Sequence, residues 1–266
     1  MAQKYHFALA ALALLLALGL CACSGGTAAL PSPTPSSEAA TPSLPSSADS
    51  GAIASPETTP ALPLSAEASV TQCAAHYFPD IQGCANLYVA VEFRNESSAN
   101  AIVSSVSVVF TVNGKTVEHS FTPPCSEYDI IAPGAVSTAA GWFAYSGSAP
   151  DGAVTATAEV TLEPVGLPQQ KPLAVSDLMI VQNYPGFATV SGRAANTSEE
   201  ADYDLTMIYL SFYDAEGTLL GVQFFTKDLM VKAGDARDFV YHLRCLPIEG
   251  LTENTATITA RGMGIS

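Results

Sequence analysis

The chain has 266 residues, and only 13% of them are charged, which is about half the share found in an average soluble domain. The chain contains 10 lysines and arginines and 25 aspartates and glutamates, so the formal net charge is −15. Binding to nucleic acid needs a basic patch that displaces phosphate counterions, so this composition argues against a nucleic-acid partner. A hydrophobic content of 48% permits a packed core and excludes a wholly disordered chain.

Residues 1–22 have the features of an export signal. Lys4 gives a positive start, and Phe7–Leu20 is an apolar run of signal-peptide length that is too short to cross a bilayer comfortably. The following Leu20-Cys21-Ala22-Cys23 resembles the lipobox of bacterial lipoproteins, Leu-x-[Ala/Gly]-Cys. The resemblance implies that Cys23 becomes the mature N-terminus, carries diacylglycerol, and holds the protein on the extracytoplasmic face of the cell membrane. An ordinary signal peptide cleaved near Ala22 is the alternative.

Residues 23–65 predict a disordered tether. This stretch holds 8 of the 18 prolines, is dense in serine, threonine and alanine, and contains no lysine or arginine. Proline disfavours helix and sheet hydrogen bonding, and the segment has too little apolar surface to offset the entropy cost of ordering. A partly ordered N-terminal arm is the alternative.

The rest of the chain predicts β-strands, because apolar residues alternate with polar or small ones instead of recurring with a helical period. Alternating runs lie at 87–93, 106–112, 140–144 and 154–162. Asn113-Gly114 predicts a tight hairpin, and Pro133-Gly134 marks a second turn.

The pattern repeats after about 100 residues, and this spacing predicts tandem domains. Asn95 matches Asn196 and Gly134 matches Gly234, with separations of 39 and 38 residues. About seven short strands in each copy favour two Ig-like β-sandwiches, at 66–164 and 172–266, with a short hinge between them.

The second copy resembles the FxLYD-type domain of bacterial surface lipoproteins. The likeness centres on Leu210-Ser211-Phe212-Tyr213-Asp214, where Leu210 and Phe212 exchange the Phe and Leu of the pattern. Around it, 190–192, 196–198 and 233–234 also fit, whereas the first copy lacks the Tyr-Asp pair. The resemblance implies an extracytoplasmic Ig-like module, and the family offers no catalytic residues to carry over.

Four cysteines remain after Cys21 is removed and Cys23 is acylated. An even number in an exported chain favours disulfides, and four cysteines permit three pairings. We expect Cys73 to pair with Cys84 across the first hairpin, and Cys125 and Cys245 either to bridge the two domains or to stay free.

The remaining motifs predict no cofactor, no metal site and no catalytic centre. There is no Cys-x-x-Cys, and His76, His119 and His242 have no metal-ligand spacing. The acidic run 199–204 is either a weak Ca²⁺ site or a solvated loop, and we expect the loop. Trp142 either stacks on a sugar or packs in the core, and we expect the core.

These observations predict a lipid-anchored extracytoplasmic lipoprotein that is not an enzyme and acts as a binding or interaction module. Its expected partners are the membrane, through the anchor, and an extracytoplasmic protein or envelope polymer. The alternative is a structural spacer or accessory subunit of a cell-envelope complex. An interaction module should expose an apolar or aromatic patch, whereas a spacer should have polar outer faces.

Overall fold

The computed structural model is all-β, and every strand pairing in it is antiparallel. It describes residues 67–79, 85–167, 172–184, 187–199, 201–227, 229–243, 248 and 250–265. The predicted signal peptide, the predicted lipidation site Cys23 and the predicted tether lie outside these residues. The described residues belong to one compact unit.

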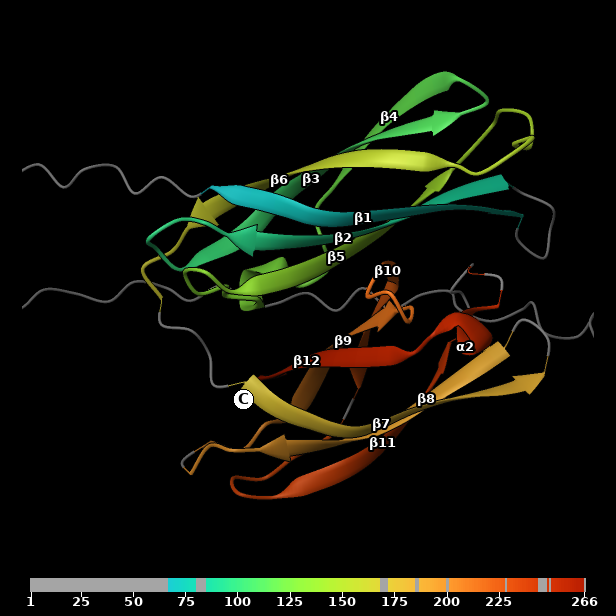
Figure 1. Cartoon of the computed structure of the whole chain (residues 1–266). Helices are drawn as coiled ribbons and strands as arrows, with labels where there is room; N and C mark the ends of the chain where they lie inside the picture. The colour runs from blue at the N-terminus through green and yellow to red at the C-terminus, as the bar shows by residue number, and fades with distance from the viewer. Residues whose placement is uncertain are drawn as a thin grey trace, which may run out of the picture. The chain divides into compact units, whose positions relative to one another are not determined.

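The first half contains six strands in two three-stranded sheets (Figure 1). One sheet has the order β1-β2-β5 and the other β4-β3-β6. The bounds of the strands are β1 Ala68–Pro79, β2 Ala85–Asn95, β3 Ala101–Val112, β4 Lys115–Phe121, β5 Val136–Ala144 and β6 Thr155–Pro164. A short 3-10 helix, η1, covers Ser126–Tyr128 between β4 and β5.

The second half has the same arrangement of strands, with one additional strand pairing. Its strands form a single six-stranded sheet of order β10-β9-β12-β7-β8-β11, because β12 also pairs with the start of β7. The bounds are β7 Pro172–Tyr184, β8 Phe187–Asn196, β9 Leu205–Tyr213, β10 Leu219–Lys227, β11 Ala236–Leu243 and β12 Thr257–Ile265. A short helix, α2, spans Leu251–Asn254. If the sheet is divided at the β12–β7 link, β7-β8-β11 and β10-β9-β12 match the two sheets of the first half.

The residues predicted to correspond between the halves make the same hydrogen bonds. The Asn95 amide donates to the carbonyls of Ala99 and Ile131, and the Asn196 amide donates to those of Ala201 and Val231. The backbone N–H of Gly134 donates to the Asn95 carbonyl, and that of Gly234 donates to the Asn196 carbonyl. Both glycines have φ near +72°, a conformation that glycine adopts without strain. The predicted repeat is confirmed at these positions.

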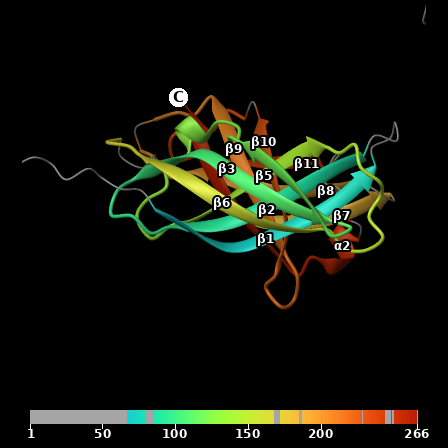
Figure 2. The same ribbon diagram turned by 90° about the horizontal axis from the view of Figure 1, so that it is seen from above.

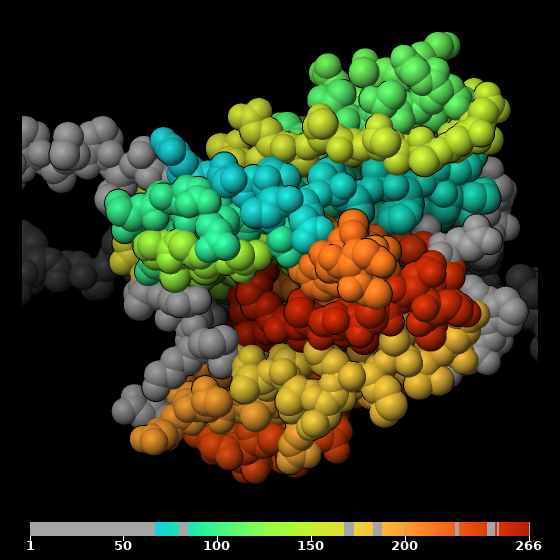
Figure 3. All heavy atoms as spheres, in the orientation of Figure 1, coloured from blue at the N-terminus to red at the C-terminus, as the bar shows by residue number. Residues whose placement is uncertain are grey.

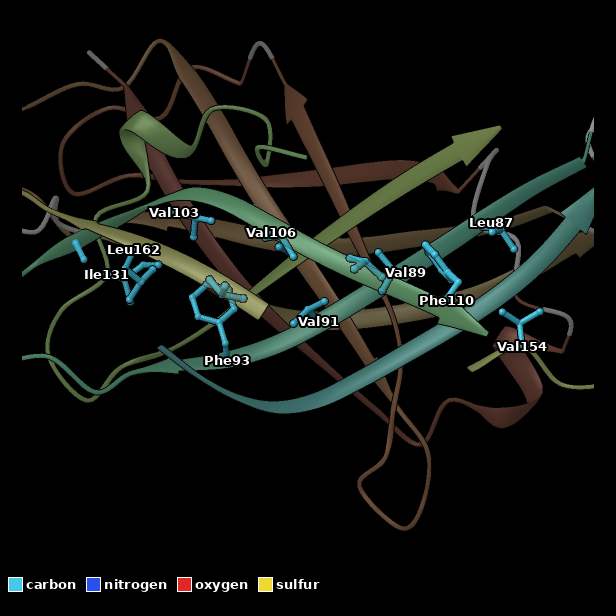
Figure 4. Close-up of a cluster of buried hydrophobic side chains, with 14 of the residues drawn as sticks. Leu87, Val89, Val91, Phe93, Val103, Val106, Phe110, Ile131, Val154 and Leu162 are labelled. Carbon is cyan, nitrogen blue, oxygen red and sulfur yellow. The ribbon is translucent and has the colours of Figure 1, made fainter. Parts of the chain in front are cut away.

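Each half encloses its own apolar core. In the first, β3 and β6 lie over β1 and β2 (Figure 2), and their inward residues pack against those of β2 (Figure 4). Its largest members include Leu87, Phe93, Phe110 and Leu162. The second core contains Ile208, Leu210, Phe212, Phe225 and Phe239. These are the residues on one side of each alternating strand, as the period-two pattern predicts.

One detail of the expected strands differs in the structure, and another is confirmed. Each half has six strands among the described residues and not about seven. The Asn113-Gly114 hairpin forms as predicted: φ is +50° and +73° at the two residues, which are the left-handed values that a two-residue β-turn requires.

Candidate interaction surfaces

The two halves meet where the outer face of β1-β2-β5 packs against the outer face of β9, β10 and β12. In Figure 3, β10, in orange, lies directly against the blue strands of the first half. We call this region the junction. Its buried residues are Tyr88, Ala90, Met207, Tyr209, Leu219, Val222 and Met263. Strands β2 and β9 are therefore buried on both faces in their central parts, whereas alternation alone predicted half-buried strands.

Tyr88 lies at the centre of the junction. Its hydroxyl donates a hydrogen bond to the Val222 carbonyl at 2.7 Å and accepts one from the Val222 N–H at 2.6 Å. Burial raises the pKa of the Tyr88 phenol, and the hydrogen bond from the Val222 N–H only partly opposes this, so the hydroxyl stays protonated and can donate. A Cβ at Gly221 would overlap Ile248 and lie 3.2 Å from the Tyr88 oxygen, so glycine lets β10 approach this ring closely.

Glu92 and Tyr213 join the two halves at one end of the junction. The Tyr213 hydroxyl donates to Glu92 Oε2 at 2.6 Å, and the Thr71 hydroxyl donates to Glu92 Oε1 at 2.7 Å. Burial and this hydrogen bond with the carboxylate raise the pKa of Tyr213 to about 12. The Ser211 hydroxyl adds a neighbouring bond to Thr138 Oγ1, at 3.3 Å. Each carboxylate oxygen of Glu92 thus has a hydroxyl donor, one from each half.

Asp214 shapes the turn that follows Tyr213. Its Oδ1 accepts hydrogen bonds from the N–H groups of Glu216, at 3.0 Å, and Thr218, at 2.7 Å. Gly217 completes the turn with φ +80°. This is the arrangement of an Asx turn, in which a side-chain oxygen accepts hydrogen bonds from nearby backbone N–H groups. The two adjacent residues therefore have distinct roles: Tyr213 contacts the first half, and Asp214 orders the β9–β10 turn.

Strand β1 holds this turn and the start of β10. The Gln72 side chain donates to the Gly217 carbonyl at 3.2 Å and accepts from the Leu219 N–H at 2.7 Å. His76 Nε2 donates to the Leu220 carbonyl at 2.8 Å. Burial lowers the pKa of His76, although the bond to Leu220 works in the opposite direction, so the neutral ring is favoured. Two side chains of β1 thus satisfy backbone groups along one stretch of the second half.

An ion pair joins the halves at the other end of the junction. Arg261 of β12 binds Asp129, whose side chain is 6% exposed, and the guanidinium carbon lies 4.6 Å from the centre of the Tyr209 ring. The Tyr209 hydroxyl donates to the Pro124 carbonyl at 3.1 Å. Burial, followed by the negative charge of Asp129, raises the pKa of Tyr209. The charge of Arg261 is therefore shared between a carboxylate of the first half and an aromatic face of the second.

The structure does not support the predicted disulfide between Cys73 and Cys84. Cys73 is a free thiol that lies opposite Val91 in the β1–β2 register and packs against the first core. Cys84 lies outside the described residues, next to Ala85, and Ala85 is opposite Pro79. The assumption that the two cysteines face each other across the hairpin was wrong about the register.

Cys125 is also a free thiol, and it packs at the edge of the junction. Burial, followed by the charge of Glu127, raises the pKa of its thiol. Cys245, with which it was predicted either to bridge the two domains or to stay free, lies outside the described residues.

The two outermost sheet faces differ in character. The outer face of β4-β3-β6 carries exposed hydroxyl and acidic side chains, including Ser107, Thr111, Glu118, Thr157, Glu159 and Thr161. The outer face of β7-β8-β11 carries large apolar side chains, with Met179, Val181 and Val240 exposed by 58%, 49% and 49%. We call this second surface the open face. The polar sheet is suited to permanent contact with water, and the open face has the apolar character of an interaction surface.

Trp142 does not lie in the core, contrary to expectation. It is 40% exposed on the outer side of β5, and its ring centre lies 5.3 Å from that of Tyr88. The next residue, Phe143, points inward and stacks on His119 at 4.3 Å. The alternation of Gly141, Trp142 and Phe143 did not determine which of these side chains faces the core. In the structure, Phe143 faces the core and Trp142 faces outward. Trp142 therefore borders the junction.

The acidic run 199–204 is divided between surface and interior in its described part. Asp202 and Asp204 are exposed, whereas Tyr203 between them is buried. Asp202 Oδ1 accepts a hydrogen bond from the Ala233 N–H, as is typical of a loop. No group of three potential metal ligands comes together within the described residues. Among those same residues, none of the helices has the length and apolarity needed to cross a membrane.

Comparison with known proteins adds no relative: no protein-family model matches the chain, and no curated protein matches it. The likeness to the FxLYD pattern therefore depends on the residues of the motif themselves.

Proposed function

We propose that the protein is a lipid-anchored extracytoplasmic lipoprotein in which two tandem Ig-like sandwiches act as a non-enzymatic interaction module. The anchor is inferred from the lipobox-like sequence ending in Cys23, and the module from the two matching sets of six strands. The observation that carries the proposal is the open face, with Met179, Val181 and Val240 exposed on one sheet. Apolar side chains gathered on one face favour a binding partner over contact with water alone.

The polar side chains that converge from distant strands support a binding protein better than an enzyme. Glu92 meets Tyr213, and Asp129 meets Arg261, in both cases across the junction. Each group is occupied by its partner in the other half. Their use is therefore structural: they hold the two sandwiches in one arrangement.

A spacer or accessory subunit of an envelope complex is the second candidate, and the junction favours it. The bonds of Gln72, Tyr88 and Glu92 to the second half would fix the angle between the sandwiches. A spacer needs such stiffness, but it has no need for an apolar end face.

The anchor is tested by separating membranes from soluble extract in cells that express the full chain. Cys23→Ser should move the protein into the soluble fraction, because two acyl chains contribute most of its membrane affinity. Cys21→Ser is the matched control and should remain with the membranes, since Cys21 leaves with the signal peptide. Membrane retention of Cys23→Ser would contradict the anchor.

The module is tested by crosslinking in intact cells. Met179→Glu with Val181→Glu should remove crosslinked species that the native chain forms. The control, Ser107→Glu with Thr157→Glu, places the same charges on the polar outer sheet and should leave them unchanged. Equal crosslinking in both variants would favour the spacer.

A further inference from the structure

We infer that the open face binds the same face of a second copy of this chain, in a two-fold symmetric pair. The inference rests on the proposed function, because it names the partner of the proposed interaction module. The repeat contains two equivalent three-strand sets, β1-β2-β5 and β7-β8-β11. One of them is covered inside the chain, and the other is exposed.

The equivalence can be followed residue by residue. Seven positions before the matched Asn95 and Asn196 are Tyr88 and Thr189, and five positions before them are Ala90 and Ser191. The strand register extends each of these positions into a row of three residues across its sheet.

The rows of the covered sheet are His76-Tyr88-Trp142 and Ala74-Ala90-Ala140. The corresponding rows of the open face are Val181-Thr189-His242 and Met179-Ser191-Val240. The covered sheet thus has its large residue, Tyr88, in the centre and receives β10 on it. The open face has small residues in the centre and its large apolar residues at both sides.

The junction identifies what kind of surface occupies such a sheet. In the first half, the occupant is another sheet, whose Met207, Tyr209 and Val222 lie against the covered rows. In a second copy, the strands that carry Met207, Tyr209 and Val222 are not available to the open face, because the first half of that copy already covers them. A second copy can offer two outer sheets, the polar β4-β3-β6 face and its own open face. Only the open face supplies apolar side chains to meet Met179 and Val181, so a two-fold pairing follows.

The charges on the open face are compatible with this pairing. Arg193 and Asp238 are directly opposite each other in the β8–β11 register and form an ion pair at 2.8 Å. Their side chains are 48% and 78% exposed, so both remain accessible to a partner. A face with one positive and one negative residue can meet a two-fold copy of itself with opposite charges adjacent.

The size of the face predicts a weak pair. The three strands have 13, 10 and 8 residues, and the area over which all three run side by side is about 14 Å by 30 Å, or about 400 Å² on each copy. This is about half of the roughly 800 Å² per partner that a stable interface buries. Attachment to a membrane raises the local concentration and can compensate for weak affinity. The pair should therefore be sought with the lipidated chain in its membrane.

The experiment places a photo-crosslinking amino acid at Val181 of the full chain in intact cells, with two differently tagged copies expressed together. We expect a product of twice the chain mass that carries both tags. The same probe at Thr157, on the polar outer sheet, should give no such product. A Val181 product that contains a different protein would overturn the inference and leave the interaction module standing. The absence of any product at Val181 would contradict both.

Two charge variants distinguish face-to-face pairing from nonspecific contact. Arg193→Asp gives the face two acids, and Asp238→Arg gives it two arginines, so either variant alone should lose most of the doubly tagged product. The two variants expressed together should regain it, because an acidic face then meets a basic one. Loss without recovery would overturn the two-fold arrangement. Both residues are exposed, and circular dichroism should confirm that neither change alters the fold.

Discussion

The hydroxyl of Tyr88 binds both backbone groups of Val222, donating to its carbonyl at 2.7 Å and accepting from its N–H at 2.6 Å. Tyr88 belongs to β2, the central strand of the β1-β2-β5 sheet, and Val222 belongs to β10, an edge strand of the six-stranded sheet of the second half. A backbone position that would otherwise be buried without a partner is thus satisfied by one side chain. The two halves consequently depend on each other for their hydrogen bonding.

Tyr88→Phe keeps the ring and removes this pair of bonds. We expect it to reduce the free energy of unfolding by about 1–3 kcal/mol, because the Val222 N–H and carbonyl would stay buried without a partner. Urea denaturation of the full chain measures the change. Tyr145→Phe is the matched control: Tyr145 packs against Tyr77 in the first core, and its loss should cost well under 1 kcal/mol. Equal effects would show that the bonds to Val222 contribute nothing.

Asp214→Ala should loosen the β9–β10 turn. The change removes the acceptor of two backbone N–H groups, and comparable side-chain caps contribute about 0.5–2 kcal/mol. Hydrogen exchange should accelerate at Glu216 and Thr218 and at Leu219, which binds Gln72. Glu216→Ala is the control, because that side chain is exposed at the tip and should leave the exchange unchanged. Unaltered exchange in Asp214→Ala would contradict the role assigned to the carboxylate.

Much of the strand layout could be predicted from the sequence. Period-two alternation placed Leu87, Val89, Val91 and Phe93 on one inner face, and all four are buried in the first core. Asn113-Gly114 defined its hairpin, because few residue pairs accept two left-handed positions in succession. These features are local, and local sequence carries the information for them.

The junction could not be predicted in this way, because it depends on contacts between residues more than 100 positions apart. Tyr88 and Ala90 are compatible with an exposed face as well as a covered one. One signal was available: Met207-Ile208-Tyr209-Leu210 is a continuous apolar run, which is typical of a strand buried on both faces. The prediction that Cys73 faces Cys84 was wrong for a related reason. Strand β1 continues for six residues beyond Cys73, and the sequence does not show where the strand ends and the loop begins.

Removing one partner of the Arg261–Asp129 pair should weaken the junction more than removing both. Arg261→Met leaves Asp129, with its 6% exposed side chain, as an unpaired buried charge, and we expect a loss of about 2 kcal/mol. Combining it with Asp129→Asn should recover part of that loss, because the buried charge is then gone. A double-mutant cycle in urea provides the coupling energy. Strictly additive effects would mean that the pair does not couple the two halves. Arg193→Met, which breaks an exposed ion pair, should cost less than 1 kcal/mol.

Alkaline pH should weaken the bond between Tyr213 and Glu92. The pKa of Tyr213 is raised to about 12 in the folded protein, above the ordinary tyrosine value near 10. The folded state therefore holds this proton more tightly than the unfolded state does, so its contribution to stability is fully present below about pH 10 and is lost as pH rises toward 12. Comparing native and Tyr213→Phe proteins across this range separates this contribution from that of the other tyrosines. The difference in free energy of unfolding should shrink with rising pH, and a constant difference would contradict the assignment.

The thiol of Cys73 should be slow to react. Burial raises its pKa to about 11, so only a small fraction is thiolate near neutral pH, and thiolate is the reactive form. Alkylation of the folded protein at pH 8, followed by peptide mass spectrometry, should label Cys73 many times more slowly than the same cysteine in urea. The peptide readout keeps Cys73 separate from Cys84 and Cys245. If Cys73 were instead joined in a disulfide, it would stay unlabelled in urea until a reductant was added. Prompt labelling in urea without a reductant would therefore establish the free thiol, and rapid labelling of the folded protein would contradict its burial at the first core.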